Sequence, residues 1–443
     1  MINNNSKDDY CGKRLEVVLL SLSWYRRKDP RTPLGMAYLY SELQNRFSEN
    51  NEVEVYFEEI DVRDNISNVI HETLIRNPEI LGIGVYAWNA EHIKKIITSL
   101  RSLEYSGIIV LGGPEITYGG NELNEEFPEV QYFVKGFGEK AFVGIVESIK
   151  SRKEIAIKGV YRKGEKIGDL LADPSLGFDS SPFSREELIP RITGDNFIRW
   201  QTQRGCVYRC SFCAFRLPNG TIAQSDLDTV RKELKTIKTL GIKNVAVLDP
   251  VFFLNRERAL NILDLIEEIT PDIKFSIQTR FEHLNLEIIE KVSRLNIVLE
   301  SGLQTLDTKV QKRIKRINNR EKVISVIHDI QVHKIMFETH LIYGLPEQTY
   351  ESFIYDLKVL MEKECRVLRI FPLSRLRGTE IDLESNNSDI IFSPIFPEEV
   401  IETKWMNRDE VFRLKKLQAF IEDNNGLISE DLMKVFCSSM EVI

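Results

Sequence analysis

The sequence predicts an α/β protein made of a doubly wound N-terminal domain, a partial barrel of parallel strands and a small C-terminal α/β tail. Two regions, 14–150 and 198–380, alternate short β-branched or apolar runs with helical stretches, a pattern typical of parallel strands covered by helices. The stretch between them, 151–197, is punctuated by Pro, Gly, Ser and Asp and is predicted to be a linker. The length of 443 residues agrees with about three folding units of ordinary size.

The N-terminal region carries five predicted strands, at 15–22, 53–60, 80–86, 107–113 and 130–136. Helical spacing of apolar residues separates some of them, at 35–47 and 90–103. In a doubly wound sheet the ligand crevice lies at the carboxyl ends of the strands, so the small and polar residues that follow these strands are the candidates for binding. The first strand is not followed by G-x-G-x-x-G, which disfavours nicotinamide and flavin cofactors.

The second region repeats the alternation six times, which predicts a partial (β/α)6 barrel over 198–380. Its strands are expected at 196–202, 244–249, 273–279, 297–302, 336–344 and 367–373. The tail, 381–443, contains the helical stretch 407–424 and is expected to cover a substrate.

Composition and charge indicate which kinds of molecule the protein binds. The formal net charge is −8 and the Lys and Arg residues are scattered, so no basic stripe indicates nucleic acid. No window reaches the apolar length of a membrane span, and the N-terminus lacks a signal-peptide pattern. We therefore expect a cytoplasmic protein that acts on a small molecule or a peptide.

Three cysteines, Cys206, Cys210 and Cys213, fall within eight positions directly after a predicted strand. Structural zinc needs four ligands, whereas the nearest other cysteines, Cys11 and Cys365, are far away in the chain. Three thiolates can instead hold a 4Fe–4S cluster and leave one iron without a protein ligand. That iron can bind the amino and carboxylate groups of S-adenosylmethionine and deliver the electron that cleaves it to a 5'-deoxyadenosyl radical. The alternative is a chance cluster of structural cysteines.

With Phe212 just before its last cysteine, the loop "RGCVYRCSFCAFR" resembles that of the radical S-adenosylmethionine superfamily. Three further segments, "LDPVFFLNRERA", "VLESGLQTLDTKVQKRIKR" and "HLIYGLPEQTYESF", are similar to those of that superfamily in the same order. The resemblance implies contacts to S-adenosylmethionine from Phe212, Asp249, Glu300, Gln304, Gly344, Leu345 and Pro346. Each has a structural alternative: Glu300 as half of an ion pair, for example, or Gly344–Pro346 as a simple chain reversal.

In the first domain, "GVYAWN", "LGGPEIT" and "GFGE" resemble the cobalamin-binding domain of one large subfamily of those enzymes, a Rossmann-like fold. The resemblance implies corrin or nucleotide-tail contacts from Trp24, Pro33, Leu34, Gly35, Tyr86, Trp88, Asn89, Gly112, Gly113, Pro114, Glu115, Gly136, Gly138 and Glu139. One departure is clear, because the loop after the first strand has Trp24, Tyr25 and Arg26 where other cobalamin domains carry Asp-x-His-x-x-Gly. This implies cobalamin without a lower histidine ligand. The alternative is a domain that binds nothing.

The tail segments "FPLSRLRGTEI" and "FPEEVIETKWMNRDEV" also resemble cobalamin-binding radical proteins. Together these resemblances imply an oxygen-sensitive methyltransferase that uses a 4Fe–4S cluster, S-adenosylmethionine and cobalamin to methylate an unactivated carbon. They also imply an external one-electron reductant such as flavodoxin or ferredoxin. A cobalamin-dependent rearrangement, cyclisation or oxidation is the first alternative, and a non-catalytic cobalamin or cluster sensor is the second. Arg280 and Tyr343 are expected near the barrel mouth, with ordinary ion-pair or packing roles as the alternative.

Overall fold

A computed structural model describes residues 14–24, 33–48, 53–173, 178, 180–185, 196–217, 220–365, 367–384, 389–427, 429, 431 and 434. The chain divides into two compact units, 1–192 and 193–443. Tyr25, Arg26, Cys11 and the linker positions 174–177, 179 and 186–195 lie outside the described residues.

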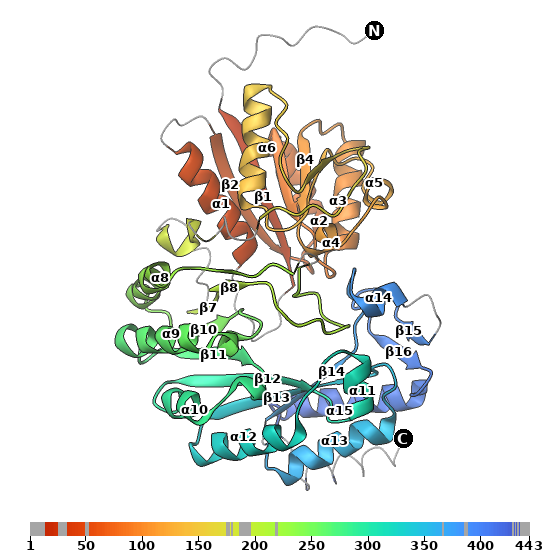
Figure 1. Ribbon diagram of the computed structural model, residues 1–443. Coiled ribbons are helices and arrows are strands. Elements are labelled where there is room, and N and C mark those ends of the chain that lie inside the picture. The colour runs from red at the N-terminus through yellow and green to blue at the C-terminus, as the bar shows by residue number, and fades with distance from the viewer. Residues whose placement is uncertain are drawn as a thin grey trace. The chain divides into compact units, whose positions relative to one another are not determined.

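Unit 1 contains a six-stranded sheet in the order β2-β1-β3-β4-β5-β6 (Figure 1). The strands β1 to β5 pair in parallel, and β6 is antiparallel to β5. The order reverses between β1 and β3, which is the topological switch point of a doubly wound fold. The strands are β1 (Leu15–Ser23), β2 (Val53–Asp61), β3 (Ile80–Gly84), β4 (Ile108–Gly112), β5 (Tyr132–Val134) and β6 (Val160–Arg162).

Helices cover both faces of this sheet, because alternate residues of each buried strand point to opposite faces. On β1, Leu20 packs in a cluster with Ile93 of α3, whereas Leu19 packs in a second cluster with Phe142 of α6. Figure 1 shows α1 and α6 side by side. The predicted doubly wound domain is confirmed. Its helices are α1 (Leu34–Phe47), α2 (Ile66–Arg76), α3 (Ala90–Ser102), α4 (Pro114–Thr117), α5 (Leu123–Glu126), α6 (Glu139–Ser151) and the short 3-10 helix η2 (Pro182–Ser184).

Unit 2 is built on a parallel six-stranded sheet in the order β14-β13-β12-β11-β10-β7. Among the described residues β14 does not pair with β7, so the barrel is open, which confirms the predicted partial barrel. These strands are β7 (Phe197–Trp200), β10 (Asn244–Val247), β11 (Lys274–Thr279), β12 (Ile297–Gln304), β13 (Met336–Tyr343) and β14 (Leu368–Pro372). A two-stranded ribbon, β8 (Gln203–Arg204) with β9 (Ala223–Gln224), follows the first barrel strand.

The helices of unit 2 begin at residues that satisfy their free backbone N–H groups. The capping side chains are Asp226, Asn255, Asn285, Asp307, Asn319, Thr349 and Asn407. They precede α8 (Leu227–Thr239), α9 (Arg256–Ile269), α10 (Leu286–Val292), α11 (Thr308–Arg313), α12 (Arg320–Val332), α13 (Tyr350–Glu362) and α15 (Arg408–Asp423). The remaining elements are η3 (Phe252–Leu254), η4 (Phe281–His283), α14 (Glu380–Glu384) and the antiparallel pair β15 (Ile390–Phe392) and β16 (Val400–Thr403).

Strand β12 shows which face of the barrel sheet is polar. Its residues alternate between buried and half-buried, so Leu299 and Leu303 share one face and Glu300 and Gln304 share the other. Right-handed crossovers place the following helices on one side of a parallel sheet, and the apolar face is the one they cover. Glu300 and Gln304 therefore point to the inside of the open barrel. None of the helices in the described ranges has the length and apolarity needed to span a membrane.

Candidate functional site

The three cysteines lie together in the loop between β8 and β9. The backbone N–H of Cys213 donates to the carbonyl of Cys210 at 3.1 Å, which closes a tight turn between them. Gly205 enters the loop with a φ of +81°, and a Cβ there would lie 2.2 Å from the carbonyl oxygen of Thr221. Only glycine fits that position. None of the three thiols forms a disulfide.

Burial determines the ionisation of these thiols. Burial raises the pKa of the Cys206 thiol, and it raises that of Cys213 to about 11. These two thiols are therefore protonated at neutral pH, and iron binding must release their protons. In the described ranges, no group of three or more His, Cys, Asp or Glu residues is gathered closely enough to hold one metal ion. The donor set still fits a cluster, because each thiolate of a 4Fe–4S cluster binds its own iron.

One arginine connects the cysteine loop to β12. Arg316 Nη1 lies 3.7 Å from Cys210 Sγ, and Arg316 Nη2 donates to the carbonyl of Gly302. The pairing of β12 with β13 shifts register between Gly302 and Gln304, and Gln304 has a φ of +71°. A bulge with a non-glycine residue at positive φ re-aims a side chain and is found disproportionately at functional sites. The fold thus brings the predicted cluster loop and the predicted S-adenosylmethionine strand together.

Two predicted contacts on β12 keep polar atoms available. Gln304 Oε1 is buried and has no hydrogen-bond partner among the described residues. Glu300 Oε1 accepts a hydrogen bond from Ser276 on β11, while its Oε2 makes none with the described residues. A buried polar atom without a partner is costly, so Gln304 Oε1 suits a polar ligand, and the half-buried Glu300 offers a second acceptor beside it.

The carboxylate of Asp249, in contrast, is already occupied. Its Oδ1 accepts from the backbone N–H groups of Thr202 at 2.7 Å and Gln203 at 2.9 Å, and its Oδ2 accepts from Thr202 Oγ1 at 2.5 Å. Only 2% of Asp249 is exposed, and burial raises its pKa to about 6. Asp249 therefore fixes the segment that leads from β7 to the cysteines. Its predicted contact to S-adenosylmethionine would need an oxygen lone pair beyond these three bonds.

The predicted adenine turn follows β13. Gly344 has a φ of +79°, and a Cβ there would lie 2.6 Å from Cγ1 of Val400 on β16. Gln348 holds the turn, since its Oε1 accepts from Leu345 N and its Nε2 donates to Ile342 O. Leu345 and Pro346 are buried, so the turn presents its backbone to a ligand rather than their side chains. Phe212, in the cysteine loop, is half-buried.

A charged group inside the barrel was not predicted as a site. Arg369 on β14 donates through Nε to Glu338 on β13 at 3.1 Å, and His340 Nε2 lies 3.8 Å from Glu338. The nearby His340 ring, together with the hydrogen bond and charge of Arg369, holds the pKa of Glu338 down, at about 2. In the sequence, the alternation of charged and apolar residues along β13 and β14 could have indicated that these side chains share one face of the sheet. Arg280 was expected near the mouth and is buried beneath the Tyr208 ring, 4.0 Å from its centre. Tyr343 is buried and donates to Gln418 of α15.

In unit 1 the predicted cobalamin residues lie at the switch point of the sheet. The rings of Tyr86 and Trp88 stack with centroids 4.4 Å apart, and Trp88 Nε1 donates to the carbonyl of Leu22 at 3.1 Å. Asn89 is fully buried and joins the ends of β1 and β3, because its Nδ2 donates to Leu22 O and Gly84 O. The aromatic pair is thus fixed where the strand order reverses, and Asn89 positions it.

Glycines shape the same edge for two reasons. A Cβ on Gly113 would lie 2.6 Å from Val85 O, and one on Gly136 would lie 2.8 Å from Ala172 O, so the fold itself requires these two. Gly35 faces the Tyr86 hydroxyl, and a Cβ on Gly112 or Gly138 would make only ordinary contacts. The absence of a side chain at Gly35, Gly112 and Gly138 therefore leaves room along this edge of the sheet. The other predicted residues, Trp24, Pro33, Leu34, Pro114, Glu115 and Glu139, lie at helix starts or strand ends around it.

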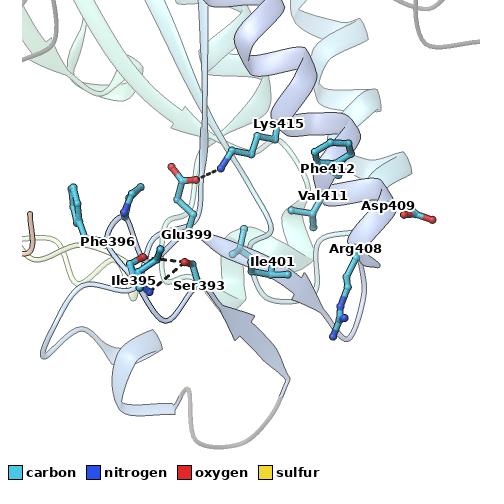
Figure 2. A pocket seen from close by; sticks show the side chains of 12 residues that line it. Ser393, Ile395, Phe396, Glu399, Ile401, Arg408, Asp409, Val411, Phe412 and Lys415 are labelled. Carbon is cyan, nitrogen blue, oxygen red and sulfur yellow. Dashed lines mark hydrogen bonds and ion pairs between the residues drawn. The ribbon is translucent and has the colours of Figure 1, made fainter. Parts of the chain in front are cut away.

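The C-terminal part of unit 2 contains a pocket of about 510 Å³, shown in Figure 2. Its walls are largely apolar, with Val411 and Phe412 on α15 and Ile401 on β16. An ion pair of 2.7 Å between Lys415 and Glu399 lies on its rim. Val400 on β16 lines the pocket and also packs against Gly344, so this strand contacts both the pocket and the predicted adenine turn.

Comparison with known proteins matches each unit to a different family model. Residues 200–360 match the radical SAM superfamily, and residues 30–146 match the B12-binding domain. An uncharacterized methyltransferase of Pyrococcus horikoshii, PH0819, is 24% identical over 74% of this chain and 72% of its own length.

Two solved structures share the fold. The radical S-adenosylmethionine methyltransferase TsrM from Kitasatospora setae, with tryptophan substrate and a SAM analogue bound, has a TM-score of 0.70 at 19% identity, covering 86% of this chain and 77% of TsrM. The cobalamin-dependent S-adenosylmethionine radical enzyme OxsB, with aqua-cobalamin bound, has a TM-score of 0.73 at 17% identity, covering 97% of this chain and 71% of OxsB.

Proposed function

Because the chain belongs to the radical SAM superfamily and is a cobalamin-dependent member of it, we propose that it is a methyltransferase acting on an unactivated carbon of a small molecule or peptide. The observation that carries the proposal is the combination, in one chain, of a B12-binding domain with a radical SAM domain whose cysteine loop supplies three thiolates. The names of PH0819 and TsrM, both methyltransferases, support it.

The two units would hold different cofactors. Cys206, Cys210 and Cys213 would hold a 4Fe–4S cluster, and unit 1 would hold cobalamin along the edge formed by Tyr86 and Trp88. When bound, these cofactors and S-adenosylmethionine supply a carbon radical and a methyl group. Such an enzyme needs a substrate and an external one-electron donor, and a flavodoxin or ferredoxin is the donor that we propose.

On the S-adenosylmethionine side, Gln304 and Glu300 would orient the ligand. The unpaired Oε1 of Gln304 can accept from an ammonium group, and Glu300 Oε2 can accept from a ribose hydroxyl. The turn at Gly344 would bring backbone against the adenine, with Leu345, Pro346 and Phe212 as its neighbours. Asp249 would act chiefly by holding the chain before the cysteines.

Unit 1 supports cobalamin without a lower histidine ligand. Its two histidines are His71 in α2 and His92 in α3, so the chain that follows β1 has none to offer. The edge residues predicted above would contact the corrin and its nucleotide tail. When bound, cobalamin would supply the methyl group that the proposed reaction transfers.

The test uses the full chain, purified without oxygen, reconstituted with iron, sulfide and hydroxocobalamin, and then given S-adenosylmethionine and a strong reductant. Bound corrin that becomes methylated while S-adenosylhomocysteine is released would support the methyltransferase. The matched variants are Cys213→Ala, which removes a proposed iron ligand, and Cys365→Ala, which removes a buried cysteine elsewhere. We expect 5'-deoxyadenosine from the second variant and none from the first.

Other outcomes contradict the proposal in different ways. Bound corrin that never takes a methyl group while 5'-deoxyadenosine accumulates would indicate a rearrangement, cyclisation or oxidation. Absence of bound corrin would show that unit 1 has another role. A Cys213→Ala variant with full biological activity would favour a sensor.

A further inference from the structure

Arg316 is a buried cation without a carboxylate partner. Only 8% of Arg316 is exposed, and none of the acidic side chains in the described residues forms an ion pair with it. Its Nε is buried without a hydrogen-bond partner, and its other nitrogens face Cys210 Sγ and the carbonyl of Gly302. Burying an unpaired charge is costly, so a fold that keeps one there is suited to an anionic neighbour.

The neighbouring Arg280 differs in this respect. It is also buried, but its Nη2 lies 3.0 Å from Glu282 and donates to the carbonyl of Ile317 at 2.7 Å. Since Glu282 compensates Arg280, Arg316 supplies the uncompensated positive charge beside the cysteines.

We propose that Arg316 is a positioning residue that raises the reduction potential of the cluster held by Cys206, Cys210 and Cys213. One-electron reduction takes an electron from the external donor and adds one negative charge to the cluster, with no bond made or broken. A fixed positive charge at hydrogen-bond distance from a ligand sulfur stabilises that added charge, and hydrogen bonds to sulfur and net charge are known to set such potentials. The inference depends on a cluster at these cysteines and not on the methyl transfer proposed above.

The test is a redox titration of the reconstituted full chain, followed by the electron paramagnetic resonance signal of the reduced cluster, first without S-adenosylmethionine. Arg316→Gln and Arg316→Met remove the charge, and Arg316→Lys keeps it on a different geometry. The control Arg313→Gln removes an arginine of the same segment that pairs with Glu384 instead. We expect the reduction equilibrium constant to fall at least tenfold in the two neutral variants, which corresponds to 59 mV for one electron.

Arg316→Lys is expected to fall between wild type and the neutral variants, and Arg313→Gln is expected to match wild type. Wild-type midpoints in both neutral variants, at full iron and sulfide content, would overturn the proposal. A reduction potential that falls as far in Arg316→Lys as in Arg316→Met would also overturn it. Arg316→Met avoids leaving a new polar group buried, which keeps the test usable if Arg316→Gln assembles poorly.

A second titration with S-adenosylmethionine separates a competing role. If the neutral variants keep the wild-type potential without the ligand and only weaken its binding, Arg316 is a ligand contact and the proposal is wrong. The two proposals can fail separately. If wild-type protein never methylates cobalamin but Arg316→Met still lowers the reduction potential, the proposed function is contradicted and the role of Arg316 is not.

Discussion

Replacement of Asp249 tests whether this carboxylate serves the fold of the cysteine segment. Asp249→Ala leaves the buried N–H groups of Thr202 and Gln203 without their acceptor. An unsatisfied buried donor costs about 1–3 kcal/mol, so the two together predict a loss of about 2–6 kcal/mol. Asp249→Asn keeps an Oδ1 acceptor for both groups, removes the charge and replaces Oδ2 by an Nδ2 donor, to which the Thr202 hydroxyl can turn as an acceptor. We therefore expect it to fold.

The pH dependence of the free energy of unfolding, compared between wild type and Asp249→Asn, is a more specific test. Burial raises the pKa of Asp249 from 3.8 to about 6, so the folded protein holds this proton more tightly than the unfolded chain. Stability from this group is therefore full below pH about 4 and falls as the pH rises through 6. Two pKa units correspond to about 3 kcal/mol, of which close to half is lost above pH 5. Asp249→Asn lacks that loss.

The assay is urea unfolding of both proteins at pH 5, 6 and 7.5, followed by tryptophan fluorescence. Trp200 is the nearest reporter, because it is fully buried on β7 and its Nε1 donates to Glu233 at 2.7 Å. We expect Asp249→Asn to gain about 1 kcal/mol relative to wild type between pH 5 and 7.5. The comparison cancels the other titrating groups, so parallel pH dependences would refute the reasoning.

Three further changes have definite expected results. Gly205→Ala places a Cβ 2.2 Å from Thr221 O, so we expect iron and sulfide content after reconstitution to fall well below wild type. Gly241 also has a positive φ, but open space surrounds it, so Gly241→Ala should keep the wild-type content. Trp88→Phe removes the hydrogen bond to Leu22 O, worth about 1 kcal/mol, and calorimetry should show a lower midpoint for unit 1; an unchanged midpoint contradicts this. Because the pKa of Glu338 is held at about 2, its ion pair with Arg369 stabilises the fold above pH about 4.5 and is lost as the pH falls toward 2. Glu338→Gln should therefore show less acid sensitivity than wild type in urea unfolding, and equal sensitivity would contradict the assignment.

The elements could be predicted where periodicity is strong. The run 15–22 becomes β1 and the run 53–60 becomes β2 almost without change of bounds. Strand β1 is a continuous apolar run because it is buried inside a parallel sheet, and the edge strand β2 alternates apolar and polar residues because it is half-buried. Strand β6, in contrast, lies within the stretch predicted as linker. It has three residues and exists because it pairs with β5, and no local pattern encodes such tertiary pairing.

The same division applies to the site. Spacing alone singled out the three cysteines, and Gly205 sits beside them in the chain. Arg316 lies about a hundred residues later, and its approach to Cys210 depends on how the chain after β12 folds back. Neither a charge run nor a period distinguishes it from the other arginines of that segment. Burial and the missing carboxylate partner, which only the folded chain shows, single it out.

Two buried ionic groups of opposite sign therefore flank one loop, and their hydrogen bonds separate their roles. Three donors satisfy the Asp249 carboxylate from within the fold, so its removal should be felt in stability before any cofactor binds. The Arg316 guanidinium keeps an unpaired Nε and directs another nitrogen at a cysteine sulfur. The bond to the Gly302 carbonyl is the one hydrogen bond from the Arg316 guanidinium to a backbone group in the described residues, and burying its charge without a carboxylate costs stability. The physical reason for an arginine at this position is then the charge that the cysteine loop carries once its thiols are ionised by iron.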